Sequence, residues 1–464
     1  MQISVVTHSK VKNDSKDFRI DAEFYLPVYL KYEKQIGKHK NEILRNLADN
    51  CYKTFRRKEG VFEYIEISNV DLEIGEYYTE ILNSDNPPSR AKKILKKSDI
   101  IISTVRPNRN AVSIILDERK DLVASTGFCK LTAKRINPKF LFILFKTSVY
   151  RDLLVRFTTA TMYPAVNEDD ILNLRIPIFD DKFQTLIESI VDYSYSFINK
   201  SKSFYSQAEQ MLLSELGLLS WKPKHRLSFV KNFSDTQASG RIDAEYFQPK
   251  YDEVVERIKQ YKKGYKSLGE IVRVKNNNFQ PKDEVTYRYI ELANISANGN
   301  INGFIEAQGK ELPTRARRMV NAGDVIVSTI EGALSSVALI NDDLDNALCS
   351  TGFFVVNSEK INSETLLVLF KSPVGQLQLK KGCSGTILTA IGDDEFKRII
   401  LPDLFAGIQS DIKRKITEMY DAKALSKRLL DIAKRGVEMA IEKSEKDAQN
   451  WIEAESEKLK IATA

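Results

Sequence analysis

The chain repeats itself, and this duplication limits the possible folds more than any single motif does. Residues 19–27 read Arg-Ile-Asp-Ala-Glu, two aromatic residues, one further residue and Pro, and residues 241–249 repeat that order. Later matches keep an offset of 225 residues, as between Asp99 and Asp324. They include 64–70 with 289–295, 99–104 with 324–329, 125–128 with 350–353 and 144–146 with 369–371. Two similar modules of about 220 residues therefore account for the chain.

Length and composition agree with a folded protein of more than one domain. The chain has 464 residues, of which 42% are apolar and 29% charged, and this balance excludes a disordered or low-complexity protein. No apolar run approaches the ~20 residues that span a bilayer, and the first residues do not resemble a secretory signal. Four widely spaced cysteines indicate reduced thiols. We therefore expect a cytoplasmic protein.

Each module is predicted to be a mixed α+β domain followed by a long helix. Helical stretches are expected at 21–37 and 138–157 in the first module, and at 243–263 and 363–381 in the second. Between them lie short β-branched runs separated by turns rich in Asn, Asp, Gly and Pro.

The two long segments, 181–220 and 406–464, place apolar residues at steps of three and four and contain no proline. Asp180 and Asp181 are a plausible N-cap for the first, and the second is expected to continue to about residue 460. The pattern favours two antiparallel helices that act as a rigid, coiled-coil-like spacer between the modules. The alternative is that each helix packs only on its own domain.

Enzyme signatures are absent or incomplete. The tetrapeptide at 86–89 resembles the Asn-Pro-Pro-Tyr motif of amino-methyltransferases, but Ser89 replaces the aromatic residue that stacks on the flipped base. Pro402-Asp403 and Lys423 match a nuclease spacing, yet Lys423 falls inside a predicted helix. The three histidines have no partners at metal-ligand spacing. We expect a protein without catalytic residues, metal or cofactor.

Basic, amide and aromatic residues cluster in loops at similar points of both modules. Arg and Lys neutralise phosphates, Arg can bind guanine through two hydrogen bonds, and Asn or Gln can do so with adenine. The net charge of +7 permits nucleic-acid binding without requiring it. The candidate DNA-binding residues are Arg56, Arg57, Lys58, Arg90, Arg106, Asn108, Arg109, Thr161, Tyr163, Lys275, Asn277, Gln280, Arg315, Arg317, Arg318 and Thr386.

In these features the chain resembles the specificity (S) subunit of Type I restriction–modification systems. The resemblance rests on the paired openings at residues 19 and 241, the paired Ser-Thr strands, and the paired hydrophobic-Pro segments 174–177 and 399–402 before each long segment. It covers essentially the full length. It implies two target recognition domains separated by two long antiparallel helices in a circular pseudo-twofold repeat. The corresponding boundaries are 1–180 and 221–405 for the domains, and 181–220 and 406–464 for the helices.

The resemblance also implies a function. Each module would read one half of a bipartite double-stranded DNA site, and the helices would set the spacer between the halves. The helices would also dock two modification (methyltransferase) subunits that carry S-adenosylmethionine. Motor-nuclease restriction subunits would join for cleavage. Two alternatives stay open from the residues alone: a non-catalytic duplicated scaffold that binds proteins through its helices, and, ranked third, a stand-alone methyltransferase, which lacks a recognisable cofactor loop.

Overall fold

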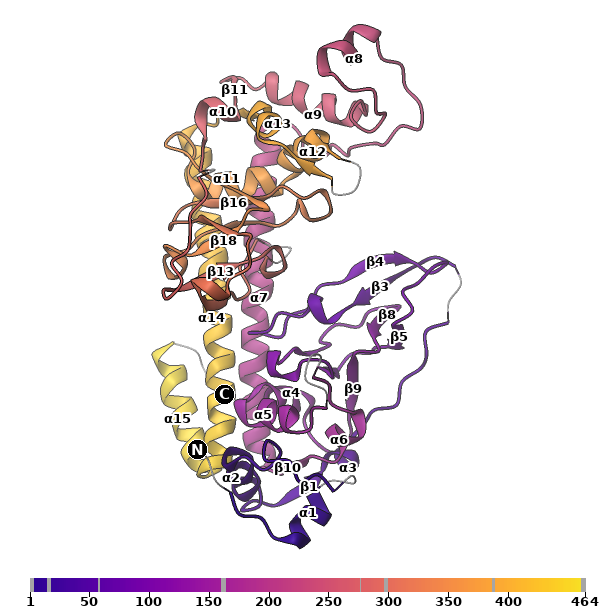
Figure 1. Ribbon diagram of the computed structural model, residues 1–464, viewed down its shortest axis with the longest axis vertical. Coiled ribbons are helices and arrows are strands. Elements are labelled where there is room, and N and C mark those ends of the chain that lie inside the picture. Colours follow the sequence, from indigo (N-terminus) through magenta and orange to yellow (C-terminus); the bar gives the residue numbers. More distant parts are fainter. Residues whose placement is uncertain are drawn as a thin grey trace. The chain divides into compact units, whose positions relative to one another are not determined.

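The chain divides into two compact units that share its two longest helices. The computed structural model describes residues 4–14, 18–56, 59–159, 164–275, 277–295, 299–385 and 389–459. Unit 1 comprises Met1–Ile198 and Ala424–Ala464, and unit 2 comprises Asn199–Lys423. Helix α7 (Asp181–Glu215) and helix α14 (Ala406–Glu442) each contribute residues to both units (Figure 1).

The described part of unit 1 contains two four-stranded sheets, with strand orders β4-β3-β8-β5 and β2-β9-β6-β7, and the two-stranded sheet β1-β10. Strands β3 and β8 run parallel, and the other paired strands are antiparallel. The strands are β1 (Asn41–Ile43), β2 (Ala48–Asp49), β3 (Val61–Ile65), β4 (Glu80–Asn83), β5 (Ala91–Ile94), β6 (Asp99–Ser103), β7 (Val112–Ile114), β8 (Leu122–Ser125), β9 (Phe128–Ala133) and β10 (Arg175–Pro177).

Unit 2 repeats this topology and adds one two-stranded sheet, β20-β21. Its described four-stranded sheets have the orders β14-β13-β18-β15 and β12-β19-β16-β17, and β11 pairs with β22 as β1 pairs with β10. The strands are β11 (Tyr265–Ser267), β12 (Arg273–Val274), β13 (Thr286–Ile290), β14 (Ile305–Gln308), β15 (Ala316–Met319), β16 (Val325–Ser328), β17 (Val337–Leu339), β18 (Leu348–Ser350), β19 (Phe353–Asn357), β20 (Cys383–Ser384), β21 (Ala390–Ile391) and β22 (Ile400–Pro402). The duplication predicted from sequence is therefore a duplication of fold.

The predicted helices of both modules are present but shorter or divided. In unit 1 they are α1 (His8–Asp14), α2 (Pro27–Ile36), α3 (Leu44–Leu47), α4 (Pro138–Lys146), α5 (Ser148–Arg156), α6 (Glu168–Leu172) and α15 (Glu445–Lys458). In unit 2 they are α8 (Phe233–Ser239), α9 (Pro249–Lys259), α10 (Leu268–Ile271), α11 (Ser363–Lys371), α12 (Pro373–Gly382) and α13 (Asp393–Arg398). None of these helices, nor α7 or α14, is long and apolar enough to cross a membrane in the described part of the chain.

The prediction of one continuous helix at 138–157, and of another at 363–381, was wrong. Thr147 has an extended backbone and its side chain accepts a hydrogen bond from the backbone N–H of Tyr150, so it ends α4 and caps α5. At the matching place in unit 2, extended Ser372 precedes Pro373, the first residue of α12, because a residue before proline is disfavoured in helical geometry.

Helix α4 forms the centre of the core of unit 1. All residues from Phe140 to Phe145 are buried, so the helix is apolar on every side. Its counterpart α11 buries Leu366–Phe370 in unit 2. Each helix packs below a four-stranded sheet, and the apolar stripes of α7 and α14 complete the same cores.

Within unit 1, the local parts of α7 and α14 run antiparallel. The Oγ atoms of Ser194 and Ser426 lie 2.8 Å apart, and the backbone N–H of Asp180 donates to Glu445 beyond the end of α14 at 2.9 Å. The Asp180 side chain also accepts from the N–H of Phe183, which confirms it as the N-cap of α7.

Within unit 2 the two helices are again antiparallel. Ser201 of α7 donates to the carbonyl of Met419 at 2.9 Å, and Lys415, one turn earlier on α14, lies over the ring of Phe204. The predicted antiparallel pairing is thus confirmed inside each unit.

The prediction that the second long helix continues to about residue 460 was wrong. Helix α14 ends at Glu442, and Ser444 caps the separate helix α15 by accepting from the N–H of Asp447. Helix α15 packs back onto α14, where a Cβ atom at Gly436 would lie 2.4 Å from Cδ1 of Ile452. The absence of a side chain at Gly436 permits this close approach.

Candidate nucleic-acid interface

In each unit a segment that carries candidate residues crosses from one four-stranded sheet to the other and hydrogen-bonds to an edge strand of the second sheet. In unit 1 the N–H of Phe55 donates to the carbonyl of Lys92 on β5 at 2.8 Å, which places exposed Arg56 beside that strand. In unit 2 the N–H of Phe279 donates to the carbonyl of Arg317 on β15 at 2.6 Å.

Aromatic contacts fix the two crossing segments in the same way. The ring of Phe55 packs on Phe62 of β3 at 4.5 Å, and the ring of Phe279 packs on Tyr287 of β13 at 5.8 Å. In unit 2 the Arg317 guanidinium donates to Gln280, so two candidate residues lie in direct contact. Each crossing segment is thus anchored by an apolar ring and presents polar neighbours.

The repeated Ser-Thr-Gly-Phe and Ser-Thr motifs connect the loops of unit 1. The N–H of Thr126 donates to the carbonyl of Arg90 at 2.9 Å, and the N–H and hydroxyl of Thr104 both donate to the carbonyl of Gly127 at 2.9 Å. Since Thr104 lies two residues before Arg106, a continuous set of bonds joins the Arg90 turn to the Arg106 loop.

Unit 2 contains the same connections. The N–H of Thr351 donates to the carbonyl of Arg315 at 2.9 Å, and the N–H and hydroxyl of Thr329 donate to the carbonyl of Gly352 at 2.8 and 3.1 Å. The motifs that mark the repeat in sequence therefore build a common frame below loops whose sequences differ.

The Arg106 loop is a constrained turn in unit 1. A 3₁₀ helix covers Pro107–Arg109, and it is flanked by Arg106 and Asn110, which have φ angles of 48° and 55°. Both are left-handed conformations that are uncommon outside glycine. The N–H of Arg106 donates to the carbonyl of Pro164 at 2.7 Å, while Asn108 and Arg109 are exposed.

Buried Lys146 supports this loop from below. It is only 5% exposed, and its Nζ donates to the carbonyls of Leu72 at 2.6 Å and Asn110 at 3.3 Å. The Asn110 side chain donates in turn to the Lys146 carbonyl at 3.0 Å. Burial, assisted by repulsion from Lys434, lowers the pKa of Lys146 to about 7.

The corresponding turn of unit 2 carries a residue that sequence reasoning missed. The 3₁₀ helix Glu331–Ala333 occupies the place of the Arg106 loop, and the N–H of Glu331 donates to the carbonyl of Thr389 at 3.0 Å. Lys371 donates to the carbonyl of Ser335 at 3.0 Å, as Lys146 does to that of Asn110. The 225-residue offset pairs Glu331 with Arg106, so the repeat itself could have revealed this position.

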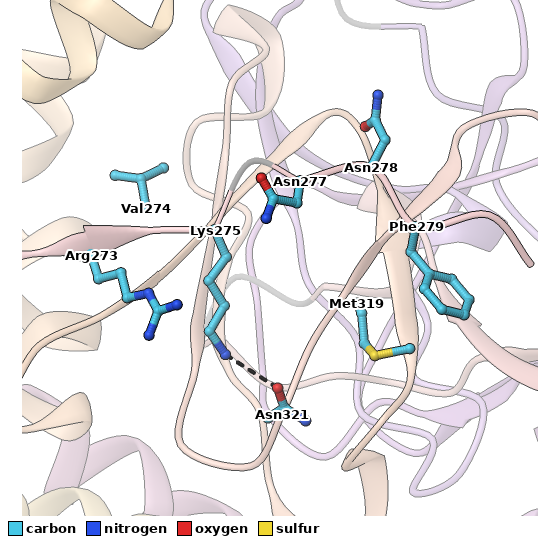
Figure 2. Close-up of a pocket in the computed structure, with 8 residues that line it drawn as sticks. All are labelled: Arg273, Val274, Lys275, Asn277, Asn278, Phe279, Met319 and Asn321. Carbon is cyan, nitrogen blue, oxygen red and sulfur yellow. Dashed lines mark hydrogen bonds between the residues drawn. The ribbon is translucent and has the colours of Figure 1, made fainter.

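Lys275 and Asn277 line a pocket of about 450 Å³ in unit 2 (Figure 2). Figure 2 shows Phe279 and Met319 on one side of this pocket. The amino group of Lys275 binds Asn321 at 3.2 Å and the buried carboxylate of Asp324 at 2.7 Å. The charge of Lys275 is therefore neutralised within the protein, whereas Asn277 is exposed.

The other candidates fall into two groups. Arg90 and Arg315 are exposed on matching turns, and Arg318 is partly buried on β15, where desolvation lowers its pKa. Arg57, Lys58, Thr161, Tyr163 and Thr386 lie outside the described residues. The structure thus brings together Arg56 with the Arg90 turn and the Arg106 loop in unit 1, and the crossing segment with β15 in unit 2.

Comparisons with known proteins agree with the sequence resemblance. Residues 47–206 match the family model of the Type I restriction modification DNA specificity domain. The chain is 29% identical over 119 residues to the Type I restriction enzyme HindI specificity subunit of Haemophilus influenzae. This alignment covers 25% of the chain and 26% of that relative, so the chain matches about a quarter of its length.

Two solved structures are similar over a greater length but at low identity. The HsdS subunit from Thermoanaerobacter tengcongensis is 17% identical, with 87% of this chain and 97% of that chain covered and a TM-score of 0.32. The Type-I restriction-modification system S subunit from M. genitalium is 12% identical, with 87% and 95% covered and a TM-score of 0.35. Residues 47–206 thus match a Type I restriction modification DNA specificity domain, and the resemblance to specificity subunits seen in the sequence is confirmed.

Proposed function

We propose that the chain is the DNA sequence-recognition subunit of a Type I restriction–modification complex, with each unit reading one half of a bipartite site. The observation that supports this most is the repeated frame of Thr104, Thr126 and Gly127 in unit 1 and Thr329, Thr351 and Gly352 in unit 2. It holds equivalent loops with different side chains, as expected if the two units read different bases on a common frame.

The proposal extends to the partners of the chain. Methyltransferase subunits would dock on α7 and α14 and would carry S-adenosylmethionine, and restriction subunits would join them. The chain itself would hold no cofactor and perform no catalysis, and a cytoplasmic location remains a prediction. A protein-binding scaffold is less favoured, because the matched family domain is a DNA specificity domain.

The test is a competition gel shift with the full chain in complex with its methyltransferase subunits. Methylation mapping in the native host first supplies the target sequence. We expect tight binding only when both half-sites are present at one fixed separation. Duplexes in which the gap is lengthened or shortened by one base pair should compete weakly. Equal competition by all gap lengths would contradict the role of the helices as a spacer, and equal competition by unrelated DNA would contradict sequence recognition.

A further inference from the structure

The turn of unit 2 that replaces the Arg106 loop presents a carboxylate where unit 1 has a guanidinium. Glu331 follows the Thr329 connection and donates its N–H across to Thr389, as Arg106 does to Pro164. The preceding residues also match, since Ile330 bridges Ala390 and Val105 bridges Ala165. The two residues therefore hold the same position in the repeated frame.

The carboxylate of Glu331 is not committed to a partner within the part of the chain that the structure describes. It is partly exposed, and it makes no ion pair or side-chain hydrogen bond with the described residues. A Cβ atom at the adjacent Gly332 would meet nothing within 4 Å, so the space over this turn is open. Burial raises the pKa of Cys383 to about 11, and the negative charge of Glu331 makes the second-largest contribution to this rise. The Glu331 carboxylate therefore lies near β20, the strand that contains Cys383.

A carboxylate is unfavourable on a surface that approaches DNA, because the phosphates repel it. Most of the other candidate side chains of unit 2 are basic or amide groups, so the acidic Glu331 differs from them in charge. An acidic side chain becomes favourable there only when it accepts a hydrogen bond from a base. In the major groove the preferred donor for Glu is the N4 amino group of cytosine.

We propose that Glu331 is a specificity-determining residue of unit 2, which accepts a hydrogen bond from a cytosine amino group in the half-site that this unit reads. The inference rests on the proposed function and deepens it. Arg106 and Glu331 would then give the two equivalent turns opposite preferences, for guanine and for cytosine on the contacted strand. The two copies of the frame would thus read different half-sites because one carries Arg106 where the other carries Glu331.

The experiment uses the full chain with its methyltransferase subunits and duplexes in which each base pair of the mapped site is changed in turn. The variant Glu331→Gln keeps the size of the side chain and removes its charge. We expect the affinity for the native site to fall roughly tenfold or more. This loss should depend on the identity of one base pair in one half-site. At that position the preference should shift toward adenine, the base that Gln binds best.

Non-specific binding distinguishes base recognition from a simple charge effect. Because the variant removes a negative charge, its affinity for unrelated DNA should stay equal or rise, while its affinity for the native site falls. Glu359→Gln, an equal charge change at an exposed turn after β19, is the matched control and should leave site preference unchanged. Glu331→Arg should transfer the preference to guanine, and circular dichroism should show that all variants fold.

Three results would decide against the inference. The first is that Glu331→Gln binds every base-pair variant of the site with the affinity of the parent. The second is a uniform rise in its affinity for all DNA, and the third is that Glu359→Gln changes the site preference in the same way as Glu331→Gln. Failure of the proposed function is distinguishable, because the unaltered complex would then show no preferred sequence. If instead the unaltered complex prefers one bipartite site and Glu331→Gln reads it identically, only the role of Glu331 is refuted.

Discussion

The buried amine of Lys146 makes the stability of unit 1 depend on pH in a direction opposite to that of a paired surface lysine. Its pKa is about 7 in the folded protein, against 10.5 for an ordinary lysine, chiefly because burial disfavours the charged form. Between these values the unfolded chain binds a proton that the folded chain does not. The free energy of unfolding therefore rises with pH across this interval.

The size of the effect follows from the two pKa values. Linkage gives about 1.4 kcal/mol per pH unit where only the unfolded state is protonated. Because the folded group is half protonated near pH 7, the gain between pH 7 and pH 9 is about 2 kcal/mol. Lys146→Met removes this titration but leaves the carbonyls of Leu72 and Asn110 without their donor. We expect the variant to be less stable than the parent, by a margin that grows with pH.

The two tryptophans allow each unit to be followed separately. Trp451 lies in unit 1 and Trp221 in unit 2, so Trp221→Phe leaves a fluorescence signal from unit 1 alone. Urea unfolding in this background at pH 7, 8 and 9, with and without Lys146→Met, isolates the lysine. If the free energies of unfolding with and without Lys146→Met differ by the same amount at all three pH values, the lowered pKa of Lys146 is refuted.

Lys371 supplies the matched comparison in unit 2. Burial lowers its pKa to about 8, and its Nζ donates to the carbonyl of Ser335 as Lys146 donates to that of Asn110. Lys371→Met in a Trp451→Phe background should therefore show the same trend, beginning about one pH unit higher and with a smaller change by pH 9.

Three further predictions concern separate parts of the molecule. Gly436→Ala should destabilise unit 1 by ~1–3 kcal/mol, because the new Cβ would overlap the side chain of Ile452. The same substitution should destabilise unit 1 by less in an Ile452→Ala background. Urea unfolding measures both effects, and a Gly436→Ala variant more stable than the parent would contradict this prediction. Arg109→Ala should weaken DNA binding by about 1–3 kcal/mol, at one half-site only, if Arg109 contacts a base. If Arg109 contacts a phosphate, binding should weaken for all sequences, and the slope of log affinity against log salt concentration should fall by about one. Cys51 is exposed and the other three thiols are buried, with burial raising their pKa values, so native alkylation followed by mass spectrometry should label Cys51 first; equal labelling of Cys129 would show that its burial is incomplete.

The repeat made much of the architecture predictable. Matching Ser-Thr and Ser-Thr-Gly-Phe motifs predict matching backbone positions, and the structure shows matching hydrogen bonds at Thr104 and Thr329. Apolar spacing and Asp180 likewise placed the first long helix, because periodicity and capping are local properties. The breaks at Thr147 and Ser444 were missed, because an N-cap residue within a helical pattern competes with helix continuation and tertiary packing decides the outcome.

The roles of individual polar residues depend on contacts between distant parts of the chain. Among the basic residues, Lys93 is buried and pairs with Glu168, and Lys275 is held by Asp324, so neither contributes a spare charge. A count of basic residues does not distinguish these two lysines from Arg56 and Arg109, which are exposed. The sequence by itself determined the duplication, the α+β modules and their long helices, because these follow from local pattern. Only the tertiary structure decided which charges are neutralised and which stay exposed, because long-range packing sets solvation and partners.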